Sequence, residues 1–384
     1  MGEASNAAYI VEAVRTPIGT RKGGLAAVHP ADLAATVLKE LVQRTNVDPA
    51  AVDDVVMGCV IQMGAQFADI ARTAWLSAGL PESVPGVVVD RQCGSSQQAL
   101  HFAAQAVMSG TQDLVIAAGV ENMAMVPINT NDILVEKFGV STTGTGWADR
   151  YGDLEITQFR GAQLIAEKWG HSREDLESYS VESHRRAIRA IDEGRFDAQI
   201  VPIGDVLVDE GPRRDTSLES MAKLKPLRDG WSLTAAVSSQ MSVGAGALLV
   251  ASEQAIRTHG LTPLARVHTL SVVGDDPVYM LAGPIRATQT VLSRSGLSID
   301  DIDVFEINEA FAPVVLAWAT ETGGDLERTN PNGGAIALGH PLGASGAILM
   351  TRLVHELGRV GGRFGLQSMC EGGGQANATI IERV

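Results

Sequence analysis

Apolar and polar positions along this chain predict strands that are followed by helices. The apolar run at residues 87–89 is short enough for a buried strand, and the alanine-rich stretch at 95–109 has the length and spacing of a helix. Similar pairs of signals recur in both halves of the sequence. Because strands that alternate with helices favour a mostly parallel sheet covered on both faces, we predict an α/β fold.

The same plan occurs twice, at an offset of roughly 250 residues. In the first half, a helix at residues 32–43 leads into a strand at 52–57, and in the second half a helix at 286–293 leads into a strand at 302–307. The repeat predicts two related halves whose equivalent turns face each other. Coincidence is the alternative, because βαβ units resemble one another widely.

The pattern divides the chain into four segments. They are 1–119 as the first part of the N-terminal half, 120–235 as an insertion, 236–260 as the end of that half, and 261–384 as the C-terminal half. Within the insertion, Ser172 and Asp175 match a capping box at the start of a helix. A long insertion into an α/β framework is usually a lid or binding segment, and the alternative is an oligomerisation element.

Length and composition describe an ordinary globular protein, with 384 residues, 45% of them apolar and 20% charged. The formal net charge of −15 argues against a nucleic-acid partner, although a local basic patch could still hold one phosphorylated cofactor. Three isolated cysteines cannot form a disulfide framework, so we expect a reducing, cytoplasmic compartment. Since no apolar run has the length of a bilayer span, we expect no membrane partner.

Cys93 is the first candidate for chemistry, because it lies at the predicted turn between a strand and a helix. The N–H groups and macrodipole of a helix N-terminus favour a thiolate and lower the pKa of a thiol there. His340 ends a glycine-rich segment that opens a helix at about 343–357 in the second half, so it would reach the thiol as a base. The alternative is a buried, inert cysteine that packs the turn.

A second thiol, Cys370, precedes three consecutive glycines, which let the backbone approach a ligand closely. Cys59 ends an apolar strand and is interpreted as a core residue. We predict no metal site, because the remaining histidines lack ligand-like spacing. The glycines around His340 form no dinucleotide fingerprint, because no acidic ribose partner follows a second strand.

Four short motifs resemble, in order and spacing, the active-site loops of thiolases, the acetyl-CoA acyltransferases. They are Gln92-Cys93-Gly94-Ser95, Asn308-Glu309-Ala310-Phe311-Ala312, Gly339-His340-Pro341 and Cys370-Glu371-Gly372-Gly373-Gly374. The resemblance extends from Arg15-Thr16-Pro17 to the last strand. It implies duplicated βαβ halves with two mixed sheets and an inserted loop domain, and coenzyme A as a co-substrate without a permanently bound cofactor.

The resemblance also implies a role for each site residue. Cys93 would carry the acyl group, and His340 would activate that thiol and help to stabilise a thioester enolate. Asn308 would hold a water that completes the first oxyanion hole. Cys370 would act as acid and base, and the backbone N–H groups of Cys93 and Gly372 would form a second oxyanion hole.

Contacts to coenzyme A are implied for five further residues. Ser239 and Met280 match positions beside the pantetheine, and Arg213 matches a basic residue near the nucleotide phosphates. Ala310 and Phe311, within the second motif, are expected at the same ligand. Each of these residues alone has a structural alternative; Arg213, for example, would otherwise belong to a solvated turn.

The implied reaction is thiolytic cleavage of a 3-ketoacyl-CoA to acetyl-CoA and a shortened acyl-CoA, through a Cys93 acyl-enzyme. Acyl-CoA and CoA are the expected partners, and a homodimer or homotetramer is the expected assembly. Two alternatives are a biosynthetic thiolase that forms acetoacetyl-CoA and a non-catalytic thiolase-fold protein that binds CoA or lipid. The direction of the reaction stays open at this point.

Other thiol enzymes fit the motifs less well. Ketoacyl synthases of the same fold have a histidine in place of Asn308 and no counterpart of Cys370, while a Cys-His hydrolase would not need a second thiol. Thr157-Gln158 stands where short-chain biosynthetic thiolases tend to have His-Met, Asp90 stands where asparagine is common in the family, and the Gln97-Gln98 pair is a further feature of this chain. This combination resembles actinobacterial degradative thiolases, including those that act on steroid side chains.

Overall fold

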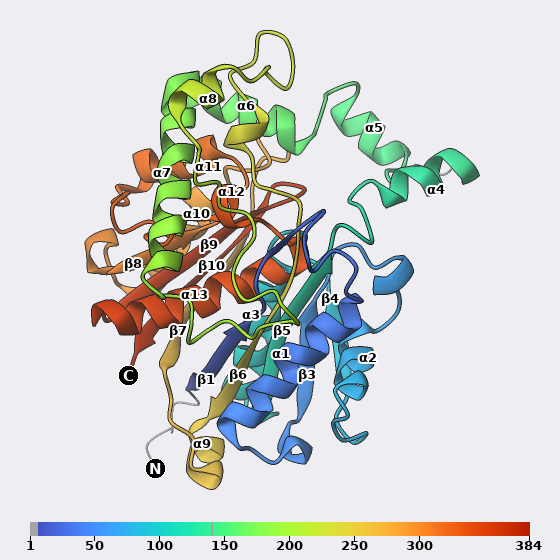
Figure 1. The fold of residues 1–384 in the computed structure, drawn as a ribbon, viewed down its shortest axis with the longest axis vertical. Coiled ribbons are helices and arrows are strands. Elements are labelled where there is room, and N and C mark those ends of the chain that lie inside the picture. The colour runs from blue at the N-terminus through green and yellow to red at the C-terminus, as the bar shows by residue number, and fades with distance from the viewer. Residues whose placement is uncertain (1–6, 140) are drawn as a thin grey trace.

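The computed structural model describes residues 7–139 and 141–384. Its strands form a ten-stranded mixed sheet in the order β4-β3-β5-β6-β1-β7-β10-β9-β8, with β2 paired to β6 (Figure 1). The strands are β1 (Ala8–Arg15), β2 (Gly19–Thr20), β3 (Asp54–Gly58), β4 (Gly86–Val89), β5 (Leu114–Asn122), β6 (Ser242–Ser252), β7 (Ala265–Gly274), β8 (Val304–Ile307), β9 (Phe364–Glu371) and β10 (Gln375–Arg383).

Helices cover both faces of this sheet, as the alternating sequence pattern predicts. They are α1 (Pro30–Thr45), α2 (Ile70–Ser77), α3 (Ser95–Met108), α4 (Thr130–Phe138), α5 (Thr145–Tyr151), α6 (Gln158–Trp169), α7 (Arg173–Asp192), α8 (Leu218–Ala222), α9 (Glu253–His259), α10 (Gly283–Ser295), α11 (Ala312–Thr322), α12 (Ala335–Leu338) and α13 (Ser345–Val360). The predicted α/β class and the repeat are both present: α1 leads into β3 as α10 leads into β8.

Two mixed sheets were expected, and the structure corrects this to one continuous sheet. The two halves are joined where β1 and β7 pair antiparallel over only two residues, Tyr9 with Arg266 and Ile10 with Ala265. Each of these strands pairs much more extensively inside its own half. The short junction satisfies backbone groups that two separate edge strands would leave free.

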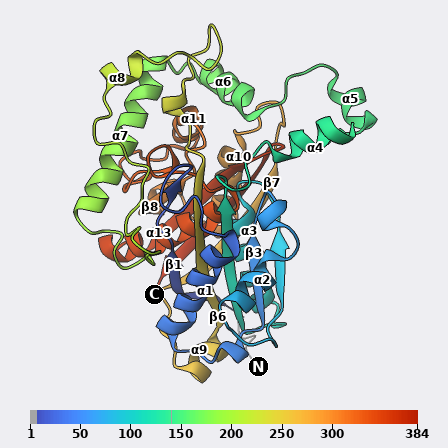
Figure 2. The same cartoon turned by 45° about the vertical axis from the view of Figure 1, so that its right-hand side comes forward.

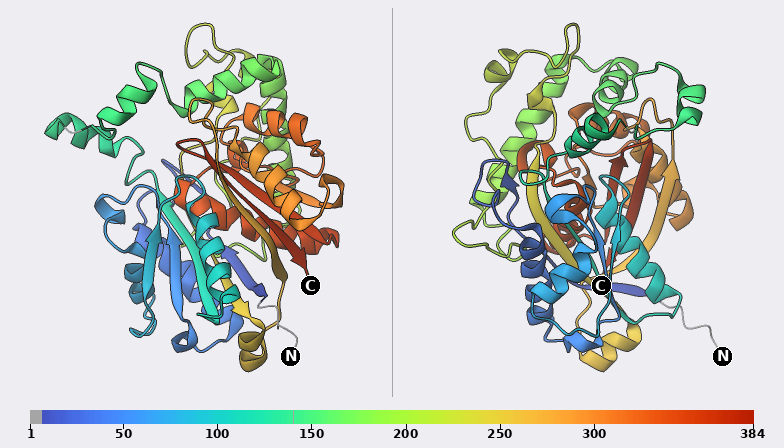
Figure 3. Two further views of the ribbon diagram at one scale, coloured as in Figure 1. Left: turned by 180° about the vertical axis from the view of Figure 1, so that it is seen from behind. Right: turned by 90° about the vertical axis from the view of Figure 1, so that its right-hand side faces the viewer.

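The helices form layers on either side of the sheet. The apolar faces of α3 and α13 share one core cluster with inward-facing residues of both halves. On the opposite face, α1 and α2 pack against the first half, and α10 and α11 pack against the second. Figure 2 shows α1 and α2 in front of the first half, and Figure 3 shows the molecule from behind, with α10 and α11 in orange. The α3 and α13 pair is therefore the central element of the fold.

The insertion between β5 and β6 contains four further helices, α4, α5, α6 and α8, besides the helix that its capping box predicts. The capping box at Ser172 is present and starts α7. In contrast, α4 and α5 have no buried residue and project from the body as an arm (Figures 1 and 3). The predicted division into four segments stays a prediction.

Within the described ranges, no helix combines the length and the apolar character that a bilayer span requires. Cys59 is fully buried at the end of β3, as its apolar surroundings in the sequence predict.

Candidate active site

Cys93 lies on the turn between β4 and α3, directly before Gly94, the N-cap residue of α3. Ser95 closes this turn: its hydroxyl donates to the carbonyl oxygen of Gln92 at 2.6 Å and accepts from the Arg91 N–H at 3.0 Å. Gln92 has a φ of 49°, in the left-handed region that residues other than glycine seldom adopt. The turn therefore holds Cys93 in a strained, well-defined place.

The N-terminal ends of α3 and α13 touch beside this turn. The N–H of Ala347 donates to the hydroxyl of Ser96 at 2.8 Å. A Cβ atom on Gly346 would lie 2.2 Å from the backbone nitrogen of Gln97, so the contact requires glycine at this position. The equivalent turns of the two halves therefore meet, as the repeat predicts.

The structure brings together the two thiols and the imidazole that the sequence singles out. Cys93 packs against the apolar cluster that contains Leu342, two residues after His340. The thiols of Cys93 and Cys370 lie near enough for a charge on Cys93 to raise the pKa of Cys370. These three residues come from segments that are far apart in the sequence: the two thiols lie beside each other, and His340 is two residues from the Leu342 cluster that Cys93 packs against.

The acidity of Cys93 differs from the sequence-based expectation of a lowered thiol pKa. Burial raises the pKa of Cys93 to about 12, and the negative charge of the neighbouring Glu371 adds to this rise. Both effects outweigh the favourable field of the α3 N-terminus, which the sequence alone could indicate. Cys93 is therefore a neutral thiol in the resting structure, and it needs a base at the moment of attack.

His340 has the tautomer that such a base requires. The hydroxyl of Ser345 donates to the carbonyl of Pro341 at 2.9 Å and lies 2.6 Å from Nδ1 of His340. Because the hydroxyl proton of Ser345 already points to Pro341, the Ser345 oxygen acts as acceptor for a hydrogen bond from the Nδ1–H of His340. Nε2 of His340 therefore carries a free lone pair. Nε2 is buried and has no hydrogen-bond partner among the described residues. Burial lowers the pKa of His340 to about 4, so the ring is neutral near pH 7.

Asn308 and Cys370 complete this group on the second half of the sheet. Asn308 follows β8, and its backbone N–H donates to the carbonyl of Ser368 at 3.0 Å. Its side-chain oxygen and nitrogen are buried, and neither makes a well-formed hydrogen bond within residues 7–139 and 141–384. Burial raises the pKa of Cys370 well above its usual value, and the nearby Asn308 amide acts in the opposite direction. An uncharged Cys370 thiol can donate a proton.

The last motif packs directly on the Cys93 turn. Gly372 follows β9, and a Cβ atom at this position would lie 2.8 Å from Oε1 of Gln92. The backbone of Gly372 therefore lies against the turn that carries Cys93, as the predicted second oxyanion hole requires.

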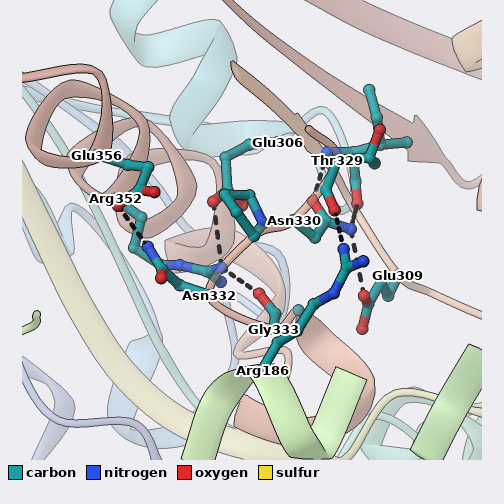
Figure 4. Close-up of polar contacts among 12 residues, drawn as sticks. Arg186, Glu306, Glu309, Thr329, Asn330, Asn332, Gly333, Arg352 and Glu356 are labelled. Atoms are coloured by element: carbon teal, nitrogen blue, oxygen red, sulfur yellow. Dashed lines mark hydrogen bonds and ion pairs between the residues drawn. The ribbon is translucent and has the colours of Figure 1, made fainter. Parts of the chain in front are cut away.

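A polar network fixes the segments that precede His340 (Figure 4). Arg352 of α13 forms a buried ion pair with Glu306 of β8 at 3.1 Å and donates to the carbonyl of Gly333. Glu309 accepts from the N–H of Ile336 at 3.1 Å. Because Glu309 directly follows Asn308, the same network positions the amide and the segment that leads to the imidazole.

A cavity of about 910 Å³ opens above the site. His340 and Leu342 lie at its inner wall, and Met123, Ile128 and Phe159 contribute apolar surface. Elsewhere, the His, Cys, Asp and Glu side chains of the described ranges form no group of three or more that could hold a metal ion.

Comparisons with known proteins agree with this geometry. Residues 8–254 match the family described as "Thiolase, N-terminal domain", and residues 261–383 match "Thiolase, C-terminal domain". This chain belongs to the thiolase family. Thiolases are acyl-CoA acyltransferases, so the protein is an enzyme of that class, and the resemblance inferred from the four motifs is confirmed.

Relatives of this thiolase extend over its whole length. A steroid 3-ketoacyl-CoA thiolase of Mycobacterium tuberculosis, FadA6, is 56% identical over 100% of this chain and 96% of the relative. A β-ketoadipyl-CoA thiolase of Pseudomonas aeruginosa is 44% identical over 99% of this chain and 100% of the relative. The crystal structure of human mitochondrial 3-ketoacyl-CoA thiolase in complex with CoA has 36% identity and a TM-score of 0.90, covering 98% of both chains. The expected likeness to actinobacterial degradative thiolases is thereby confirmed.

The predicted CoA contacts of this thiolase fall into two groups. Ser239, Arg213 and Phe311 line the 910 Å³ cavity. Met280 and Ala310 do not line it; they are buried in the apolar cluster that also contains Cys370. Met280 and Ala310 therefore support the wall of the site from behind.

Two residues that line the cavity, Arg21 and Lys22, were not predicted from the sequence. Arg21 and Lys22 line the mouth of the cavity, and Glu210 holds their loop by accepting from the N–H groups of Thr20 and Gly24 at 2.9 and 2.7 Å. In the sequence, Arg21 and Lys22 are visible as a pair of basic residues shortly after Arg15-Thr16-Pro17. Only the fold shows that this loop reaches the cavity.

Proposed function

We propose that this thiolase degrades 3-ketoacyl-CoA substrates with CoA, and that Cys93 carries the acyl group. The observation that supports this proposal most directly is that two thiols with raised pKa values lie beside each other, while the neutral imidazole of His340 lines a cavity of about 910 Å³. A covalent thioester requires a nucleophile, its base and a separate proton donor, and the three side chains can supply these three functions.

The first half-reaction transfers the acyl group to the enzyme. Sγ of Cys93 attacks the 3-keto carbon while Nε2 of His340 accepts the thiol proton. The bond between carbons 2 and 3 then breaks, its electron pair forms the enolate of acetyl-CoA, and the Cys370 thiol protonates the enolate carbon. Acetyl-CoA leaves, Cys93 holds the shortened acyl group as a thioester, and Cys370 is left as a thiolate.

The second half-reaction releases that group and restores both thiols. Cys370 accepts the proton of the incoming CoA thiol, and the CoA sulfur attacks the Cys93 thioester. When the tetrahedral intermediate collapses, the Cys93 sulfur leaves and regains its proton from His340. The high pKa of the buried Cys370 suits this role, because a weakly acidic thiol protonates an enolate and its thiolate is a strong base.

Charge that develops on oxygen needs donors at two places. We assign the first to Nε2 of His340 in its protonated form together with a water bound by Asn308, since the Asn308 amide lacks a well-formed partner in the described part of the chain. The second is assigned to the backbone N–H groups of Cys93 and Gly372. Preorganised donors of this kind typically contribute about 3 kcal/mol to transition-state stabilisation.

The cavity also supports a proposal on substrate class. Its apolar wall, formed by Met123, Ile128 and Phe159, suits an acyl group larger than acetoacetyl. One relative is named for a steroid-derived substrate and another for β-ketoadipyl-CoA. We therefore favour degradation of bulky 3-ketoacyl-CoAs over synthesis of acetoacetyl-CoA. A cytoplasmic homodimer or homotetramer is part of this proposal, and light scattering of the purified protein measures the assembly.

Mass spectrometry after incubation with a panel of 3-ketoacyl-CoAs tests the function. We expect a mass increase on the Cys93 peptide that corresponds to the acyl chain shortened by two carbons, and none in Cys93→Ala. Cys370→Ala should still be acylated by a reactive acyl donor but should not cleave a 3-ketoacyl-CoA. Equal loss of both activities in Cys370→Ala would contradict the separate roles of the thiols, and preferential turnover of acetoacetyl-CoA would contradict the substrate class.

A further inference from the structure

Glu371 is a buried acid that the reaction described above does not use. It is the last residue of β9, directly after Cys370, and its side chain is completely buried. Neither carboxyl oxygen finds a hydrogen-bond partner among the residues that the structure describes. Buried polar groups are almost always paired, so a carboxyl group without a partner next to a reactive thiol calls for a functional explanation.

The carboxyl group lies over the N-terminal end of α3. A Cβ atom on Gly94 would lie only 1.9 Å from Oε1 of Glu371, so glycine at the N-cap is what makes room for this side chain. Gly94 is the residue directly after Cys93. The acid and the thiol therefore lie side by side at the same helix end.

Arg91, the cation near Glu371, already donates hydrogen bonds to other side chains. Arg91 donates from Nε to Oε1 of Gln98 at 2.7 Å and from Nη1 to Oε1 of Gln375 at 2.9 Å. A carboxylate without a cation or donors is very costly inside a protein, whereas the neutral acid is far less so. Burial accordingly raises the pKa of Glu371 to about 8, against a smaller opposite effect of Arg91.

Two other acids near Cys93 accept hydrogen bonds from backbone N–H groups, although burial still raises the pKa of each. Glu121 of β5 accepts from the N–H groups of Val60 and Gly343, at 2.9 and 2.8 Å. Asp90, on the Cys93 turn, accepts from the N–H of Gln92 at 2.7 Å. On the same strand as Glu371, Cys370 is neutral because burial raises its pKa. Glu371 is thus a neighbouring acid whose carboxyl oxygens make no well-formed hydrogen bond within the described residues, and only the charge of Arg91 and the backbone of Asn377 weakly favour its ionised form.

We propose that Glu371 is a positioning residue that sets the reactivity of Cys93: as a neutral acid it leaves the α3 N-terminus free to stabilise the developing thiolate, and its ionisation places a competing negative charge there. This inference rests on the proposed role of Cys93. Glu371 would act through the electrostatic field at Sγ of Cys93, and this role requires no contact between Glu371 and substrate.

The test compares Glu371→Gln, which is neutral at every pH, with the wild type. The rate constant for alkylation of Cys93 by iodoacetamide is measured against pH, with the Cys93 peptide quantified by mass spectrometry. We expect the ratio of the variant rate to the wild-type rate to be nearly constant well below pH 8 and to increase above it. If ionised Glu371 raises the pKa of Cys93 by one unit, the ratio of the two alkylation rates should increase by about tenfold. A ratio that does not change across this range overturns the proposal.

Two further variants distinguish the electrostatic effect of Glu371 on Cys93 from an effect on the structure. Glu306→Gln removes another buried acid whose pKa burial raises to about 8, but Glu306 is not among the charges that act on Cys93, so its ratio should stay flat. Glu371→Asp keeps a titratable group and should restore the wild-type pH dependence. If Glu371→Gln does not fold, Glu371→Leu, which is also uncharged and similar in size, replaces it with the same expected result.

Failure of this inference and failure of the proposed catalytic function can be told apart. Acyl transfer to a residue other than Cys93 would contradict that function, even if alkylation of Cys93 depended on Glu371 as expected. Conversely, normal acylation of Cys93 with a flat alkylation ratio would contradict only the role of Glu371.

Discussion

Ser345 is a small residue with a direct influence on the proposed base. Its hydroxyl links the carbonyl of Pro341 to Nδ1 of His340, and this arrangement leaves Nε2 as the acceptor. Without the hydroxyl, the ring could rotate or adopt the other tautomer, and Nε2 would no longer be ready to accept the Cys93 proton.

We expect Ser345→Ala to lower kcat by about tenfold, the equivalent of one hydrogen bond to a group that becomes charged, with a smaller effect on KM. Steady-state kinetics with one 3-ketoacyl-CoA measure both constants. Thr351→Val is the matched control, because the Thr351 hydroxyl donates to a carbonyl of the same helix and does not contact His340. Equal loss of kcat in both variants would show that the effect comes from α13 and not from the imidazole.

Individual site residues differ in how far the sequence could predict them. The positions of Cys93, His340 and Cys370 at turns of the two halves were predictable, because each lies in a glycine-rich motif with a fixed place in a strand-to-helix plan; their catalytic roles stay predictions. The high pKa of Cys93 was not, because it depends on burial and on Glu371, and both are properties of the folded chain. The burial of Met280 behind the cavity was also not predictable, since a loop position in the sequence does not say which wall it supports.

The junction of α3 and α13 sets the geometry of the whole site. Helix α3 begins at the Cys93 turn, and α13 begins shortly after His340, so any movement of one helix relative to the other changes the distance between thiol and base. Gly346 permits their close contact.

Gly346→Ala should therefore destabilise the protein by about 1–3 kcal/mol through overpacking and should lower activity further by separating the two turns. Chemical denaturation gives the free energy of unfolding, and acylation of Cys93 gives the activity. Gly358→Ala in the same helix is the control, because nothing lies within 4 Å of a Cβ atom there. That change should increase stability by up to about 1 kcal/mol. Destabilisation by both substitutions would contradict a specific role of the contact.

Helices and strands that bury an apolar face were predictable from periodicity, as α3, β3 and β8 show. Helices α4 and α5 were not, because no residue of either is buried and their sequences carry no strong apolar stripe. The pairing of β1 with β7 extends over two residues and involves strands more than 200 positions apart, so no local pattern could indicate it.

The chain as a whole carries several buried groups with shifted pKa values, and these make its stability depend on pH. Burial raises the pKa of Glu306 and Glu371 from 4.5 to about 8, so the folded protein binds more protons than the unfolded chain between these values. Burial lowers the pKa of His101 to about 3 and that of His340 to about 4, which acts in the opposite direction below 6.5. Between about pH 6.5 and 8 the glutamates act alone among these four groups.

The free energy of unfolding should consequently fall as pH rises from about 6.5 through 8, because the two glutamates must ionise in the folded state or remain protonated at increasing cost. Urea denaturation at a series of pH values measures this slope. Glu306→Gln and Glu371→Gln should each make it shallower. A free energy of unfolding that rises with pH over this interval in the wild type would contradict the assignment of buried, neutral carboxyl groups.

The contact between α3 and α13 has one more consequence. The proposed nucleophile lies in the first half of the chain and its proposed base in the second, so neither piece alone holds the complete candidate site. A polypeptide severed in the short link between β6 and β7 would recover turnover only through complementation, when the two fragments dock again along these helix ends.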